Sequence, residues 1–376
     1  MKKYVYLDNA ATSYPKPKTV AKAVADAVEK ESGNPGRGFH QPGMAATRII
    51  FQAREEAALF LGLPHPERLV FTSGATYGLN LALKGLLGPG DRVAVSRLEH
   101  NAVTRPLETL KKRGVLVEHA PCLENGTPDP SKIPDVKMLV TTVASNVTGA
   151  MADIGALAKA CRKKGTLLVL DAAQAAGSIP MPSAGEASVL VAPGHKGLLG
   201  PQGVGLAWFA PGVEPEPMVE GGTGSASEDP FTPEFWPDRH EAGTTNTPGV
   251  AGLLAGIRYI SARGVKSIRE HETTLCAMLI EALGNHPDID LYPPHDAAKR
   301  SSLVSFNVRG VDCATVANLL DQKHVASRAG LHCSPEAHRF MGTFPGGATR
   351  VSPGPFTTKR EIRLFISTLV KIISAK

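Results

Sequence analysis

The feature that most constrains the fold of this chain is a regular alternation of short apolar runs with longer helical patterns. The apolar runs predict strands at 68–72, 92–96, 137–143, 166–170, 189–192 and 205–209. Helical patterns are found at 18–30, 47–61, 77–86, 104–112, 154–164 and 250–263. Because strands that alternate with crossover helices form parallel sheets, we predict an α/β fold with a doubly wound, mainly parallel sheet. Its ligand site should lie at the carboxyl ends of the strands.

The pattern changes after a stretch rich in Gly, Pro, Ser and Thr at 211–248. Beyond it, the sequence predicts helices at 265–283, 314–320 and 357–373 and a strand at 302–307. At roughly 150 residues per domain, the length favours two or three domains. We therefore predict a large domain over 16–249 and a smaller α+β domain built from 1–15 and 250–376.

Charge, cysteine usage and hydropathy argue against several classes of protein. Lys and Arg number 41 against 35 Asp and Glu, and they lie in scattered groups without interleaved aromatics, which argues against nucleic-acid binding. Five dispersed cysteines without a CxxC or HExxH motif favour neither a disulfide framework nor a metal site. No apolar run approaches the roughly 18 residues that span a bilayer, so we expect a cytoplasmic protein without a membrane anchor.

Asp171 and Lys196 follow two successive predicted strands. Asp171 ends the strand at 166–170, where a buried carboxylate needs a donor or a cation as its partner. Lys196 lies in the glycine-rich loop after 189–192, where its amine can form a Schiff base with a carbonyl cofactor. Taken singly, Asp171 also suits a structural cap and Lys196 a solvated loop. Together they are typical of a pyridoxal phosphate site.

Other polar groups follow other strand ends. The SGAT segment at 73–76 opens a helix whose free N–H groups favour an anion, and the Thr76 hydroxyl adds a donor. His100 can stack on a flat cofactor, and Asn146 can reach a ring oxygen or a substrate carboxylate. Each also has an ordinary structural interpretation, as an N-cap, a surface histidine or a turn asparagine. Their shared position at strand ends favours a single site.

On these residues the chain resembles the class V, fold-type I pyridoxal phosphate enzymes of the cysteine desulfurase and selenocysteine lyase group. The resemblance extends from about residue 6 to residue 351. The segments that carry it are YLDNAAT (6–12), GRGFH (36–40), FTSGAT (71–76), EHNA (99–102), ASNVTG (144–149), DAAQ (171–174), GHKGLLGPQG (194–203) and EAGTTNT (241–247).

The resemblance implies that the large domain binds pyridoxal 5'-phosphate. Lys196 would carry the cofactor, and Asp171 would pair with its ring nitrogen. Gln174 would meet the ring hydroxyl oxygen, and His100 would stack on the ring and return protons during the reaction. Lys196 and His100 are therefore expected to be catalytic as well as cofactor-binding.

The phosphate of the cofactor would be bound by Thr76 and His195, with Thr244 reaching across from the second subunit of a homodimer. Ala75 lies in the same cradle. Pro193 and Ala75 stand where many relatives have hydroxyl donors, so the resemblance implies that this cradle relies more on backbone groups.

The segment ASRAGLHCSPEAH indicates the type of reaction. Cys333 in it is similar to the persulfide-forming cysteine of group II desulfurases, and we expect His332 to lower the pKa of its thiol. Arg350 resembles the arginine that clamps the substrate carboxylate. Asn146 and His40 are also expected at the substrate, whereas the other four cysteines are expected to be structural.

The resemblance implies a homodimeric lyase that converts L-cysteine or L-selenocysteine to L-alanine. Sulfur would pass to Cys333 as a persulfide and on to an acceptor protein, and selenium would be released. Two alternatives remain open: another pyridoxal phosphate reaction such as transamination or epimerisation, and a non-catalytic scaffold for sulfur transfer. Cys333 disfavours the first, and Lys196 with Asp171 disfavours the second.

Overall fold

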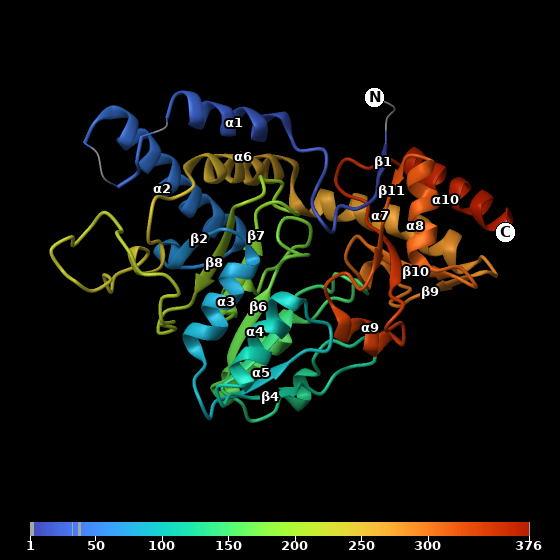
Figure 1. Ribbon diagram of the computed structural model, residues 1–376, viewed down its shortest axis with the longest axis horizontal. Coiled ribbons are helices and arrows are strands. Elements are labelled where there is room, and N and C mark those ends of the chain that lie inside the picture. Colours follow the sequence, from blue (N-terminus) through green and yellow to red (C-terminus); the bar gives the residue numbers. More distant parts are fainter. Residues whose placement is uncertain (1–3, 32, 37–38, 376) are drawn as a thin grey trace.

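Figure 1 shows the computed structural model of the chain, in which a large sheet and a small sheet lie side by side, each with its own helices. The structure describes residues 4–31, 33–36 and 39–375. The large sheet has seven strands in the order β2-β8-β7-β6-β5-β3-β4. In chain order they are β2 (Leu69–Thr72), β3 (Arg92–Val95), β4 (Leu116–His119), β5 (Met138–Thr142), β6 (Leu167–Asp171), β7 (Val189–Pro193) and β8 (Gly205–Phe209).

The large sheet confirms the predicted fold class. From β7 to β4 all neighbouring strands are parallel, and β8 alone runs antiparallel to its neighbours β7 and β2. Six of the seven strands were predicted from their apolar runs. The edge strand β4 was not, because its sequence LVEH is short and its side chains are only partly buried.

Helices cover both faces of the large sheet (Figure 1). They are α1 (Lys18–Glu29), α2 (Gln41–Leu61), α3 (Ala75–Leu86), α4 (Asn101–Lys111), α5 (Ile154–Lys164) and α6 (Thr247–Arg263). Helix α2 begins six residues before the predicted position, because His40 caps it and Pro42 occupies its first turn, while the apolar periodicity begins only later.

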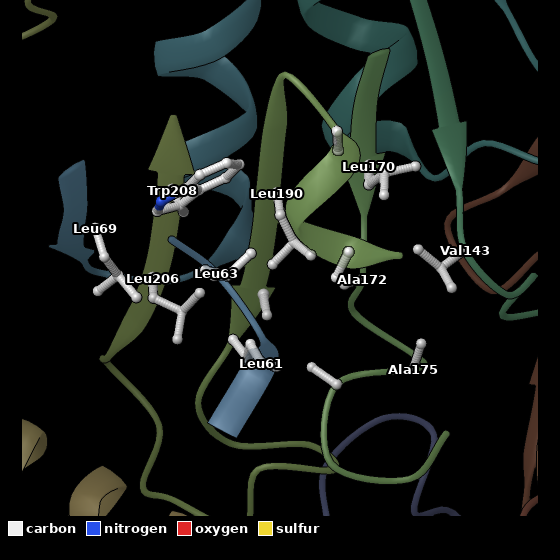
Figure 2. Close-up of a cluster of buried hydrophobic side chains, with 14 of the residues drawn as sticks. Leu61, Leu63, Leu69, Val143, Leu170, Ala172, Ala175, Leu190, Leu206 and Trp208 are labelled. Carbon is white, nitrogen blue, oxygen red and sulfur yellow. The ribbon is translucent and has the colours of Figure 1, made fainter. Parts of the chain in front are cut away.

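The core of the large sheet lies on both of its faces because alternate strand residues point to opposite sides. Leu170 and Leu190 join the cluster shown in Figure 2, which also contains Leu61 of α2 and Trp208 of β8. Val140 of β5, Val169 of β6 and Val191 of β7 belong to a second cluster, which also contains residues of α3 and α4. Burial on both faces explains why these strands read as continuous apolar runs.

The C-terminal part forms an antiparallel four-stranded sheet with the order β12-β13-β10-β9. Its elements are α7 (Val265–Gly284), β9 (Ile289–Leu291), β10 (Val304–Val308), α8 (Cys313–Gln322), β11 (Val325–Ala326), β12 (Arg328–Gly330), α9 (Pro335–Met341), β13 (Ala348–Val351) and α10 (Lys359–Ser374). The N-terminal strand β1 (Val5–Tyr6) pairs in parallel with β11, so this N-terminal segment packs with the C-terminal part of the fold (Figure 1).

Helix α6 packs against α1 and α2, and its residues Val250, Leu253 and Ile257 belong to the core of the large sheet. Helix α6 thus packs with the large sheet, and the predicted domain boundary near residue 250 stays a prediction. No helix among the described residues is long and apolar enough to cross a membrane.

Candidate functional site

A cavity of about 460 Å³ lies at the carboxyl ends of the large sheet's parallel strands and extends to the small sheet. Most of the predicted site residues line it: Ala75, Thr76, His100, Asn146, Asp171, Gln174, His195, Lys196, Cys333 and Arg350. They come from segments up to 275 positions apart, from Ala75 to Arg350. The parallel sheet brings them together because its strands end at one edge.

Asp171 and Lys196 provide a buried acid and an amine in this cavity. Asp171 ends β6, is 3% exposed, and one carboxylate oxygen accepts a hydrogen bond from the Ala173 N–H at 2.9 Å. Burial raises the pKa of Asp171, and the nearby Lys196 amine opposes that shift. Burial lowers the pKa of Lys196 to about 8. A substantial fraction of the Lys196 amine is therefore neutral, and hence nucleophilic, near neutral pH.

The N-terminus of α3 forms an anion cradle at the wall of the cavity. Its N-cap is Gly74, so no side chain caps the first N–H groups of the helix. Gly205 of β8 lies directly beneath Gly74, and a Cβ on Gly205 would come within 2.7 Å of the Gly74 Cα. The Ser73 and Thr76 side chains also line the cavity. Free amides and hydroxyls arranged in this way suit a phosphate group.

His100 and His195 are neutral imidazoles at the cavity. His100 caps α4 through its Nδ1, which accepts a hydrogen bond from the Ala102 N–H at 3.0 Å. Burial lowers the pKa of each imidazole to about 4. Nδ1 of His195 is buried and has no hydrogen-bond partner among the described residues. An unpartnered buried nitrogen at the wall of a cavity is suited to a ligand atom.

Gln174 and Asn146 line the cavity but already have protein partners. The Gln174 amide donates to the Ala10 carbonyl at 2.9 Å. The Asn146 amide donates to the His332 carbonyl at 2.7 Å, and its oxygen accepts from the Ser334 hydroxyl at 2.8 Å. Asn146 therefore clamps the chain on both sides of Cys333, a role that sequence reasoning did not foresee because the partners lie more than 180 residues away.

Arg350, on β13, presents a buried cation to the cavity. Its guanidinium donates to the Asp8 carboxylate at 3.0 Å and to the Asn146 carbonyl at 2.8 Å. Its Nε is buried without a partner in the described part of the chain. The exposed Arg328 lies at the same cavity. Sequence analysis did not propose Arg328 or Asp8 as site residues, although both lie inside segments that carry the family resemblance.

Cys333 lies on the short loop between β12 and α9 and is exposed at the cavity. His332 and Cys333 both adopt left-handed backbone conformations, with φ of 49° and 57°. This conformation is costly for residues other than glycine, so surrounding contacts must hold it. Besides the Asn146 clamp, the Asn101 N–H donates to the Cys333 carbonyl at 2.7 Å.

The expectation that His332 activates the Cys333 thiol as a cation is wrong. The His332 ring makes a buried contact with His338, where the ring nitrogens lie 3.2 Å apart. Burial lowers the pKa of His332 to about 2, so this imidazole is neutral. His338 contacts the Thr343 hydroxyl at 2.7 Å. The histidine pair thus anchors the loop and adds no positive charge beside the thiol.

The remaining cysteines differ from Cys333 in exposure. Cys161, Cys276 and Cys313 are buried, and Cys122 is partly buried. Burial raises the pKa of Cys161 to about 11 and that of Cys276 to about 12, which keeps both thiols protonated. Because the thiolate is the nucleophile, these two sites are unreactive.

Two predicted site residues lie outside the cavity of their own chain. His40 is exposed at the start of α2, and its Nδ1 accepts a hydrogen bond from the Gly43 N–H at 3.2 Å. Thr244 is exposed and lines a neighbouring pocket that shares Ser73 and Gly203 with the cavity. Arg37 and Gly38, from the GRGFH segment, lie outside the described residues.

Glu99 is a further buried acid that sequence analysis did not single out beyond its place in EHNA. Its carboxyl group contacts the Ser96 hydroxyl at 2.5 Å and accepts from the Thr142 N–H at 2.7 Å. Burial raises the pKa of Glu99 to about 8, so it is mostly protonated near neutrality. It fastens the turn that carries His100 to the neighbouring strand β5.

Comparisons with known proteins agree with this architecture. The sequence model of the family described as Aminotransferase class-V matches residues 5–365. A protein named probable cysteine desulfurase from Methanothermobacter thermautotrophicus is 32% identical over 385 residues, covering 99% of this chain and 95% of the relative. The predicted family resemblance is therefore confirmed.

Two solved structures extend the similarity to the whole fold. The apo structure of a cysteine desulfurase from Thermococcus onnurineus NA1 has a TM-score of 0.93 at 31% identity and covers 99% of this chain and 95% of that chain. A cysteine desulfurase from Escherichia coli, solved as an S-sulfonic acid, has a TM-score of 0.88 at 27% identity, with 99% and 95% of the two chains covered.

Proposed function

This chain belongs to the Aminotransferase class-V family, and from that premise we propose that it is a pyridoxal 5'-phosphate-dependent cysteine desulfurase that converts L-cysteine to L-alanine. The observation that carries the proposal is one exposed cysteine, Cys333, in the same cavity as Lys196 and Asp171. Turnover of L-selenocysteine, which the sequence resemblance also implies, stays a prediction.

The residues of the cavity fit pyridoxal 5'-phosphate. The uncapped N-terminus of α3 and the unpartnered His195 Nδ1 suit its phosphate. The buried Asp171 carboxylate suits its protonated ring nitrogen, because a buried carboxylate needs a donor or a cation. The Lys196 amine suits its aldehyde, and the neutral His100 ring offers a flat face for stacking. When bound, the cofactor would supply an electron sink for the bonds at the substrate Cα.

Lys196 has two tasks in this proposal. Its amine would hold the cofactor, and as a free base it would take the proton from the substrate Cα. The pKa of about 8 suits both tasks, since an amine of ordinary basicity would remain protonated at neutral pH. His100, which is neutral, is placed to carry protons at the same site.

Arg350 orients the substrate by its carboxylate. The guanidinium is buried and rigidly held by Asp8 and the Asn146 carbonyl, and its Nε remains free to donate. Arg328 adds a second positive charge at the mouth of the cavity. A planar guanidinium binds a carboxylate through two parallel hydrogen bonds, which fixes the direction of the rest of the substrate.

Cys333 accepts the sulfur. Its thiolate attacks the substrate Sγ, the substrate C–S bond breaks, and the electron pair of that bond stays with the substrate carbon. That carbon then takes up a proton and the substrate Cα regains the proton that Lys196 removed, so the products are alanine and a persulfide on Cys333. The reaction is balanced without an external oxidant or reductant. The clamped left-handed loop keeps the thiol exposed to the cavity for this step.

A homodimer belongs to the same proposal, with Thr244 reaching the phosphate from the second subunit. Two observations support it. Thr244 is exposed and does not line the cavity of its own chain, although the resemblance assigns it to the phosphate. Phe39, Met44 and Phe51 form an exposed apolar group beside a pocket of about 800 Å³, and exposed patches of this kind are typical of subunit interfaces.

Alanine release from L-cysteine tests the proposed activity. The cofactor-loaded protein should form alanine in the presence of dithiothreitol, and Lys196→Ala should form none above the background of free cofactor. Production of the keto acid 3-mercaptopyruvate instead of alanine would favour transamination. A colourless protein that takes up no added cofactor would favour a non-catalytic scaffold.

A further inference from the structure

An open groove of about 340 Å³ leads outward from Cys333 between α3 and α4. It shares Thr76, His100, Ala102 and Cys333 with the main cavity, so the two spaces meet at the thiol. Helices α3 and α4 pack against each other along the groove. Cys333 is therefore accessible from the substrate side and from this outer side.

The wall of the groove formed by α3 is a polar stripe. Thr76, Asn80 and Lys84 line it, and their spacing of four residues places them on one face of the helix. The stripe spans eight residues, which is about 12 Å at the rise of an α-helix. Lys84 is exposed at its outer part.

The wall formed by α4 repeats this pattern. Asn101, Arg105 and Thr109 line the groove at the same spacing, and Arg105 is exposed. The two stripes begin beside Cys333, in the first turns of α3 and α4. The groove therefore runs between two polar helix faces, and Cys333 lies at its inner end.

The groove is positively charged, because Lys84 and Arg105 line it without acidic partners in the part of the chain that the structure describes. Neither Lys84 nor Arg105 has a carboxylate within ion-pair distance among the described residues, and no acidic side chain of that part of the chain lines the groove. Many other exposed basic residues do have such partners, for example Lys111, whose amine contacts the Glu108 carboxylate. Two unpaired cations beside a thiol attract an anionic ligand.

We propose that this groove docks a sulfur acceptor protein that presents a cysteine thiol on a short acidic segment. The inference rests on the proposed function, because it requires a persulfide on Cys333. An extended segment of about four residues spans the roughly 12 Å of the groove at about 3.3 Å per residue. A site of this length along two helices suits a polypeptide better than a compact thiol.

The transfer step is a balanced thiol–persulfide exchange. The acceptor thiolate attacks the outer sulfur of the Cys333 persulfide, and the sulfur–sulfur bond of that persulfide breaks. Cys333 leaves as a thiolate, and the acceptor carries the new persulfide. No electrons enter or leave the pair, and Lys84 and Arg105 serve only to hold and steer the acidic segment.

The test compares short synthetic peptides of equal length that carry one central cysteine between acidic or between basic residues. Protein persulfidated with L-cysteine is mixed with each peptide, and mass spectrometry follows the loss of the outer sulfur from the Cys333 peptide. Each rate is expressed as the ratio of wild type to variant, which cancels differences in the reactivity of the two peptides. The variant is Lys84→Glu with Arg105→Glu, and the control is Lys359→Glu with Lys371→Glu on α10.

We expect the charge reversal in the groove to slow transfer to the acidic peptide about tenfold at low salt and to speed transfer to the basic one, with the effect shrinking as salt is added. The α10 variant should leave both rates unchanged. Equal effects on both peptides, or no effect, would overturn the docking site. Mercaptosuccinate, a small dicarboxylate thiol, is the third probe: if it matched the acidic peptide in rate and charge dependence, the groove would serve a small acid and the acceptor-protein proposal would be wrong.

Alanine formation with dithiothreitol separates this inference from the proposed function. The groove variant should keep the wild-type rate of alanine formation, because a neutral small thiol does not need the two cations. If wild type forms no alanine and no persulfide, the proposed function itself has failed. If alanine forms normally but peptide charge has no influence, only the docking site has failed.

Discussion

Arg350 shows how one residue can serve both the site and its supporting structure. It is 2% exposed, bridges the N-terminal Asp8 to Asn146, and through Asn146 is linked to the loop of Cys333. The sequence placed Arg350, Asn146 and Cys333 at one site because their segments resemble a known family. It could not show that they contact one another, nor that the His332 ring faces His338, because those contacts depend on tertiary packing.

Arg350→Lys should raise the KM for L-cysteine about tenfold, equivalent to about 1.4 kcal/mol of lost binding free energy. An ammonium cannot hold Asp8 and the Asn146 carbonyl and still bind a carboxylate through two hydrogen bonds. Steady-state alanine assays measure the change, with the surface variant Arg258→Lys as control. A KM equal to that of wild type would show that the carboxylate binds elsewhere.

The pKa of Lys196 predicts the pH dependence of cofactor uptake. Only the neutral amine adds to an aldehyde, and burial lowers the pKa of Lys196 to about 8. The uptake rate of pyridoxal 5'-phosphate by the apoprotein should therefore rise from pH 6 through pH 8 and level off above about pH 9. Stopped-flow visible absorbance measures it, and Lys196→Ala should bind no cofactor covalently. A rate that keeps rising through pH 10 would mean that Lys196 has an ordinary pKa.

At the scale of elements, the large sheet was predictable and the small one mostly was not. Six strands of the large sheet are buried on both faces and read as apolar runs, whereas β9 and β12 have three residues each and β13, with the sequence ATRV, has two polar residues at its centre. The two-residue strands β1 and β11 pair across more than 300 residues, a contact that no local pattern encodes. The SGAT segment predicted the anion cradle at the start of α3. The sequence could not predict that Gly205 of β8 packs closely against Gly74 of this cradle.

Gly205→Ala should weaken the affinity for pyridoxal 5'-phosphate about tenfold, or about 1.4 kcal/mol. The added Cβ would lie 2.7 Å from the Gly74 Cα and would push the start of α3 out of position. Titration of the apoprotein with cofactor measures the affinity, and thermal unfolding of the apoprotein reports the fold. The control is Gly155→Ala on α5, where the nearest neighbour of the new Cβ would be the Ser183 hydroxyl at 3.3 Å. If Gly205→Ala bound the cofactor with the affinity of wild type, the proposal that the start of α3 binds the phosphate would be wrong.

At the scale of the whole molecule, the N-terminal segment packs with the C-terminal part of the chain, where β1 pairs with β11. The N-terminal segment carries Asp8 to Arg350 and completes the wall of the cavity with Ala10 and Ala11. Thr244 is exposed and does not line the cavity of its own chain. The proposed dimer supplies that group from the partner.

Subunit complementation tests this arrangement. Co-expression of Lys196→Ala chains with Thr244→Ala chains should yield mixed dimers in which one site has both Lys196 and a threonine donated across the interface. The mixed dimer should form alanine faster than the Thr244→Ala homodimer at limiting cofactor. Activity no higher than that expected from the Thr244→Ala subunits alone would show that Thr244 acts within its own chain or not at all.

The most direct test of the central claim is the mass of the Cys333 peptide after one turnover with L-cysteine in the absence of an acceptor thiol. The account predicts one added sulfur on Cys333, one alanine per persulfide, and no alanine from Cys333→Ala with L-cysteine. Cys276→Ala, which removes a buried thiol, should behave like wild type in this assay if it folds. A persulfide found only on another cysteine, or full alanine formation from L-cysteine by Cys333→Ala, would contradict the account.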